Sequence, residues 1–180
     1  MQRDDVLKLV TNLVASENLI NHMLCVEAAM RWYARKFGED EEMWGLAGLA
    51  HDADWERYPH EHPQHIMREL GARGAHSSVI QAINAHGGKD AIAPIALMDK
   101  ALFACDELCG FIVAVGRMRP GKLADLEASS IIKKMKDKGF AANVSREDIY
   151  NGAEMIELSL DEHITNIIVA IRPLQEVIYT

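Results

Sequence analysis

The sequence predicts an all-helical fold, a compact bundle of six to nine helices. Apolar residues recur at helical spacing almost everywhere along the 180 residues, and no segment alternates strictly over the length of a strand. Hydrophobic residues make up 49% of the chain, which is typical of a globular protein with a core. The length favours one domain, residues 1–180, with C-terminal helices at about 122–180.

Capping residues and helix breakers divide the chain into its predicted helices. Ser16 suits an N-cap, and Gly38 suits the end of the helix that follows. Ser145 with Asp148 three residues later is a capping-box pattern, and Pro173 is expected to kink or end the last helix. The predicted ranges are about 5–14, 17–37, 40–50, 63–70, 76–85, 94–115 and 123–138, then a helix after residue 145 and one from about 161.

Charge and cysteine content argue against several classes of protein. The net charge is −8, whereas a nucleic-acid surface needs a broad basic face. No signal-peptide pattern and no apolar run of about 20 residues is found, so no membrane partner is expected. Three cysteines, an odd number, do not suggest a disulfide framework, which favours a cytoplasmic location. No pattern predicts an oligomeric state.

Four residues of metal-ligand type fall on the core-facing side of predicted helices or at a helix end. His22 shares its face with apolar neighbours, as does Asp106, and His51-Asp52 closes a helix. A lone inward histidine is more often a core residue, and a lone aspartate is often a cap. Their convergence from three helices instead favours a metal site, in the part at about 16–116. Histidine nitrogen with carboxylate oxygen suits Mn, Fe, Co, Ni or Zn.

This order of residues resembles the HD superfamily of metal-dependent phosphohydrolases, most of all its small bacterial stand-alone members. The local contexts at 18–22, 45–52 and 101–108 are similar, and the stretches 110–115 and 134–141 extend the resemblance. The resemblance implies an HD-type helical domain with His22, His51, Asp52 and Asp106 as metal ligands. It also implies hydrolysis of a phosphoester in a nucleotide or another small phosphorylated metabolite.

The sequence departs from two HD variants. The lysine that some members carry shortly after the His-Asp pair is missing, because Ala53, Asp54 and Trp55 follow here. The motif of cyclic-dinucleotide phosphodiesterases is absent as well. Asp54, two residues after the pair, is a candidate to orient a metal-bound water, with a solvated surface position as the alternative.

A second metal is the hypothesis for His62 and His86. HD proteins with two metals place extra histidines between the His-Asp pair and the last aspartate, and Asp52 would then bridge the ions. Pro63 suits the first position of a short helix, which would make His62 its N-cap on the buried side. His65 is expected to be exposed, and the direction of His60 is not predicted. The alternative is that His62 only caps the helix and His86 is a core histidine.

Basic residues could contact a substrate phosphate, although a solvated helix face is the more common role of such runs. They are Arg57, Lys89, Lys100, Arg117, Arg119 and the lysines at 133, 134, 136 and 138. Two further classes of function stay open at this point. One is an HD-type di-iron oxygenase, which cleaves C–C or C–P bonds and needs two metals. The other is a binding module that keeps a metal but turns nothing over.

Overall fold

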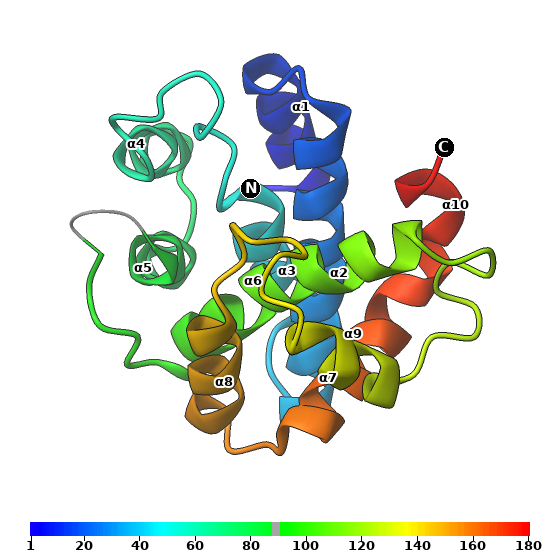
Figure 1. Ribbon diagram of the computed structural model, residues 1–180. Coiled ribbons are helices and arrows are strands. Elements are labelled where there is room, and N and C mark those ends of the chain that lie inside the picture. Colours follow the sequence, from blue (N-terminus) through cyan, green and yellow to red (C-terminus); the bar gives the residue numbers. More distant parts are fainter. Residues whose placement is uncertain (88–90) are drawn as a thin grey trace.

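Figure 1 shows the computed structural model, which describes residues 1–87 and 91–180. Within these ranges the regular elements are helices and no strand occurs, so the predicted all-helical class is confirmed. The elements are α1 Arg3–Leu13, α2 Glu17–Phe37, α3 Glu41–Ala50, α4 Gln64–Ala72, α5 Ser77–His86, α6 Leu97–Arg117, α7 Ala128–Met135, α8 Arg146–Met155, α9 Leu160–Ile171, the 3-10 turn η1 Arg172–Leu174 and α10 Gln175–Ile178.

The predicted caps of α2 and α8 are confirmed. The Ser16 hydroxyl accepts a hydrogen bond from the Leu19 amide, and Gly38 ends α2 in the left-handed conformation with φ 73°. The Ser145 hydroxyl accepts from the Asp148 amide at 3.1 Å. These side chains satisfy backbone groups that have no partner inside the helix, so local sequence sets both boundaries.

The helix α6 starts later than the sequence predicts. It begins at Leu97 instead of Pro94, because the Asp99 carboxylate accepts hydrogen bonds from the amides of Ile95 and Ala96. That carboxylate fixes the entry of the chain into the helix.

The helix α7 is also shorter than predicted, since it begins at Ala128 and not near residue 123. The Arg172 guanidinium, from the turn η1 that follows α9, donates to the carbonyls of Leu123 and Leu126. Those two carbonyls lie in the segment before α7. In a longer helix they would accept hydrogen bonds from backbone amides, but here they accept from Arg172.

The long helices α2 and α6 run through the centre of the molecule (Figure 1), and most other helices pack against one of them. α3 lies so close to α2 that a Cβ added at Gly48 would stand only 2.8 Å from the Val26 carbonyl oxygen. α5, α8 and α9 cover α6, and one cluster of buried side chains draws on α1 to α10. This packing brings the end of α3 next to the first turns of α2 and the middle of α6. Among the described residues, no helix is both long and apolar enough to cross a membrane.

Candidate metal centre

The structure brings the four predicted ligands together from three helices. Nε2 of His22, on α2, lies 2.9 Å from Oδ1 of Asp106, on α6, and 3.3 Å from Nε2 of His51, at the end of α3. Nε2 of His51 is 3.4 Å from the same Asp106 oxygen, and Oδ2 of Asp52 is 3.6 Å from His51. One ligand atom from each residue lies within 4.8 Å of the others. Because a divalent ion lies about 2.0–2.2 Å from such atoms, this spacing fits one ion among them.

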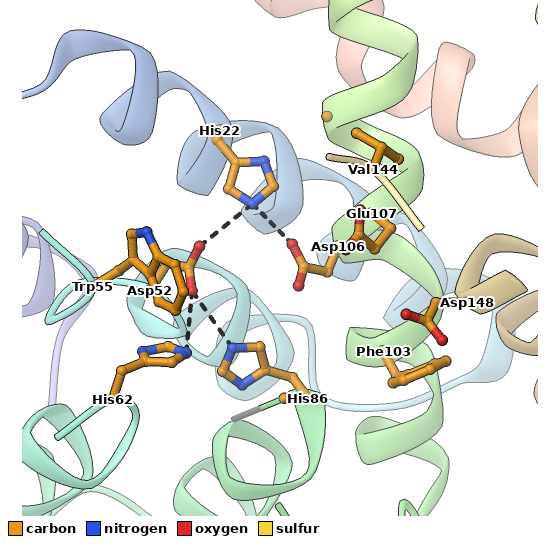
Figure 2. A pocket seen from close by; sticks show the side chains of 12 residues that line it. His22, Asp52, Trp55, His62, His86, Phe103, Asp106, Glu107, Val144 and Asp148 are labelled. Atoms are coloured by element: carbon orange, nitrogen blue, oxygen red, sulfur yellow. Dashed lines mark hydrogen bonds and ion pairs between the residues drawn. The ribbon is translucent and has the colours of Figure 1, made fainter. Parts of the chain in front are cut away.

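A second group of ligand atoms shares Asp52 with the first. Nε2 of His62 lies 3.6 Å from Oδ1 of Asp52, and Nε2 of His86 lies 3.5 Å from the same oxygen. The other oxygen, Oδ2, faces His22 and His51. Figure 2 shows the carboxylate between His22 on one side and His62 and His86 on the other. The two oxygens of Asp52 therefore face two different sets of histidines.

Hydrogen bonds at Nδ1 orient three of the four histidine rings. Nδ1 of His51 donates to the Gly48 carbonyl at 2.8 Å, and Nδ1 of His86 donates to the Ile83 carbonyl at 2.5 Å. Nδ1 of His62 donates to Oδ1 of Asp54 at 2.7 Å. When such a ring is neutral, the proton held at Nδ1 leaves the Nε2 lone pair available to a metal ion, and in all three residues Nε2 faces the cluster. The donor set and its tautomers therefore fit a divalent metal ion.

The electrostatics of the cluster also favour a cation. Although burial opposes the charged form, His51 and His86 hold the pKa of Asp52 at about 2. Burial likewise opposes ionisation of Asp106, but His51 and His22 keep its pKa well below the ordinary value. Burial lowers the pKa of His51, yet the charges of Asp52 and Asp106 outweigh it and raise that pKa to about 9. Two ionised carboxylates in a partly buried site favour the binding of positive charge, which a metal ion would supply.

The cluster lies on the wall of a cavity of about 380 Å³, a volume suited to a small molecule. In Figure 2, Trp55 borders the cavity on the side of His62, and Phe103 lies on the opposite side. Glu107 and Asp148 also line the cavity. Burial, and then the nearby charge of Asp106, raises the pKa of Glu107 to about 7. Beyond the metal ligands, the cavity thus combines two aromatic rings with two carboxyl groups.

Glu107 and Asp148 are the residues that sequence reasoning missed at this site. The Ser145–Asp148 pattern predicted a reciprocal capping box, in which the Asp148 carboxylate would accept from the Ser145 amide. That amide instead donates to Oε2 of Glu107 at 3.2 Å, from α6. Asp148 is therefore left to face the cavity. The sequence pattern indicated Ser145 and Asp148 as a capping pair. Only the packing of α6 against α8 shows that the Ser145 amide donates to Glu107 and not to Asp148.

The expected surroundings of the histidines need two corrections. His62 is not an N-cap: Pro63 occupies that position of α4, and the His62 side chain turns toward Asp52. His65 is half-buried and not exposed, because its ring stacks on Tyr58 with centroids 3.7 Å apart. His60 is exposed.

Asp54 lies in a different place from the one its expected role requires. It is fully buried, it does not line the cavity, and its oxygens accept from Nδ1 of His62 and from the Ile66 amide at 2.9 Å. A carboxylate so engaged has no oxygen directed at the cavity to orient a water. The geometry instead ties Asp54 to the ring of His62.

The basic residues with a predicted role in phosphate binding do not line the cavity. Among the described residues, the cavity wall contains no lysine or arginine. Arg57 donates to the Asn12 carbonyl, Arg117 to Asn18, and Arg119 to Asp125. Lys89 falls outside the described residues. Any positive charge on the described lining would therefore come from the histidines or from a metal ion that the histidines and aspartates hold.

These features define a class of protein: an all-helical domain that gathers histidines and aspartates from several helices around a metal-binding point. The family model of the HD domain matches residues 19–110, about half of the chain, and the chain belongs to this family. HD domains are typically metal-dependent phosphohydrolases. No curated protein and no solved structure shows a significant match to the chain.

Proposed function

We propose that this protein is a two-metal phosphohydrolase acting on a small phosphorylated metabolite or nucleotide. The observation that carries the proposal is that the two carboxylate oxygens of Asp52 face two different sets of possible metal ligands. His22, His51 and Asp106 would complete one ion site, and His62 and His86 would contribute to the other, with Asp52 as the bridge. When bound, divalent ions of this kind lower the pKa of a coordinating water toward about 7 and neutralise charge on a phosphoryl group.

The chain's own residues would bind and orient the substrate. The phosphoryl group would enter the cavity on the side of the cluster, where the described wall offers no other cation. The remainder of the substrate would then lie along Phe103, near Glu107 and Asp148. Carboxylates accept hydrogen bonds and repel anions, so the non-phosphorylated part is expected to be neutral or to carry N–H or O–H donors. This favours phosphomonoesters of nucleosides or amino-bearing metabolites over substrates with a second anionic group.

The test measures inorganic phosphate released from a panel of nucleoside monophosphates, sugar phosphates and amino-alcohol phosphates, with Mn, Fe, Co, Ni or Zn added in turn. We expect activity that requires a divalent metal, disappears with chelator and is lost in Asp52→Asn. Asp161→Asn, an exposed position far from the cluster in sequence, is the matched control and should retain activity. Undiminished hydrolysis by Asp52→Asn would assign the activity to a contaminant or another site and would refute the proposal.

A di-iron oxygenase is the second candidate, because the same bridged arrangement would serve two iron ions. The discriminating measurements are the iron content of freshly purified protein, its absorption spectrum and its oxygen consumption. Iron-dependent oxygen uptake in the absence of phosphate release would favour the oxygenase. Two bound ions with neither activity would leave the binding module as the remaining function.

A further inference from the structure

A second cavity of about 420 Å³ lies between the first turn of α2 and the end of α6. Its wall includes Arg117, Arg119 and Lys122, three cations that converge from the C-terminal end of α6 and the turn after it. It shares no lining residue with the cavity at the metal cluster. A local excess of positive charge stands out in a chain whose net charge is −8.

The simplest role for such cations is to cap the end of α6, but the contacts argue against it. Arg117 does not donate to the carbonyls of α6; its guanidinium donates to the side-chain oxygen of Asn18, on α2. Nζ of Lys122 donates to the Tyr179 carbonyl at 3.3 Å and lies 5.3 Å from the centroid of that ring. Over residues 1–87 and 91–180, no ion pair joins either residue to a carboxylate.

The third cation is partly neutralised. Arg119 pairs with the Asp125 carboxylate at 2.9 Å, while its Nε atom is buried without a hydrogen-bond partner in the described structure. One side-chain carboxylate, Glu17, also lines the cavity, and so does Thr180, the last residue of the sequence. Among the side chains, three cations therefore face one lining carboxylate and one partner outside the wall, which leaves an excess of one positive charge.

We propose that this cavity binds a phosphate-type anion, with Arg117 and Lys122 as its principal contacts. Arginine presents paired N–H donors that match two phosphate oxygens, and lysine adds a point charge. The amides of Asn18 and Asn21, also in the wall, supply further donors. Arg117 already uses one donor on a neutral amide oxygen, a bond that a charged oxygen would replace with a stronger one.

This anion site is distinct from the metal centre. Gly110 lines the metal cavity and Arg117 lies seven residues further along α6, which corresponds to about 10 Å along the helix. The inference therefore does not depend on the proposed hydrolase function, and it holds for metal-free protein as well.

The experiment is isothermal titration calorimetry of the full chain at low ionic strength, with pyrophosphate and, separately, inorganic phosphate as the ligand. It is run on metal-loaded protein and on protein stripped with chelator and then dialysed. We expect binding to stripped protein that weakens with added salt and falls at least tenfold in Arg117→Gln/Lys122→Gln. Lys133→Gln/Lys138→Gln removes the same charge from exposed positions outside this cavity and should bind as the wild type does.

Glu17→Gln provides a test of opposite sign, because removing the lining carboxylate should strengthen binding severalfold. The Glu17 side chain is exposed, so this substitution is expected to leave the fold intact. The variant therefore still tests the proposal if the double variant does not fold. Binding seen only in metal-loaded protein would place the anion at the metal centre and overturn the proposal. Equal losses in the two double variants, or unchanged affinity in Glu17→Gln, would also overturn it.

Discussion

The carboxylate of Asp54 holds the ring of His62 in place: Oδ1 accepts from Nδ1 of His62 at 2.7 Å, and both side chains are buried. Oδ2 accepts from the Ile66 amide, so the first turn of α4 fixes the carboxylate as well. The result is that Nε2 of His62 faces Oδ1 of Asp52. A carboxylate that orients a metal-binding histidine is a common arrangement around metal sites and contributes to affinity.

Asp54→Asn is expected to weaken binding of the second ion about 10- to 100-fold and to leave the first ion nearly unaffected. His62 and the Ile66 amide donate to different oxygens of Asp54, and an asparagine places a donor NH₂ at one of these two positions, so one of the two hydrogen bonds is lost. Metal titration followed by calorimetry separates the two affinities. Equal weakening of both ions would indicate a general structural defect, and no change in either would contradict a positioning role.

Metal stoichiometry tests the two ligand sets directly. Wild-type protein saturated with Mn is expected to hold about two ions, and His62→Ala and His86→Ala about one each, because each variant loses one of the two histidines that face Oδ1 of Asp52. His65→Ala is the control, since that ring stacks on Tyr58 and belongs to neither set. Elemental analysis gives the counts. A wild-type value that never exceeds one ion would refute the two-metal arrangement.

Gly48→Ala is expected to destabilise the fold by roughly 1–3 kcal/mol through overpacking. The new Cβ would meet the backbone of α2, 2.8 Å from the Val26 carbonyl oxygen, and backbone atoms cannot turn aside as a side chain can. Gly71→Ala, in α4, is the control: its Cβ would make an ordinary contact with Ile80 at 3.6 Å. That change should be neutral or stabilise by up to about 1 kcal/mol. Urea unfolding measures both, and equal effects would contradict the close approach of α3 to α2.

His163 is expected to make stability fall as the solution is acidified. The ring is buried, its Nδ1 accepts from the Tyr33 hydroxyl at 2.6 Å, and its Nε2 donates to the Ala104 carbonyl at 2.9 Å. Burial lowers its pKa from 6.5 to about 4, although the Ala104 carbonyl opposes the shift. Between those two values the unfolded chain binds a proton that the folded chain does not, so stability is lost as pH falls through that window.

The loss attributable to this one group is roughly 3 kcal/mol between pH 6.5 and pH 4. The measurement is urea unfolding at several pH values in wild type and in His163→Gln. The variant should be less stable at pH 7, since Tyr33 and Ala104 lose their partner, but its stability should depend less steeply on pH. Histidines of the metal cluster contribute to both proteins, so the difference in slope reports on His163. Identical slopes would contradict a neutral, buried ring.

Local sequence by itself determined the helical class and most boundaries. The period of the apolar residues, Ser16 and Ser145 as caps, and Gly38 as a stop act through neighbours within a few positions, so they can be interpreted without knowing the fold. The order His22, His51-Asp52, Asp106 was sufficient to indicate the family. The single domain, the cytoplasmic location and the ligand assignments themselves stay predictions.

The tertiary structure alone decided which polar groups meet. Asp54 looked like a candidate to orient water, but the fold of the segment before α4 turns it toward His62 and Ile66. The sequence pattern predicted that Asp148 would accept from the Ser145 amide as part of a capping box. In the structure that amide donates to Glu107, which lies 41 residues before Asp148 and on another helix. A hydrogen bond needs two groups within about 3 Å, and for residues on different helices that distance depends on how the helices pack. Helical periodicity tells which face a residue occupies, and packing decides what that face meets.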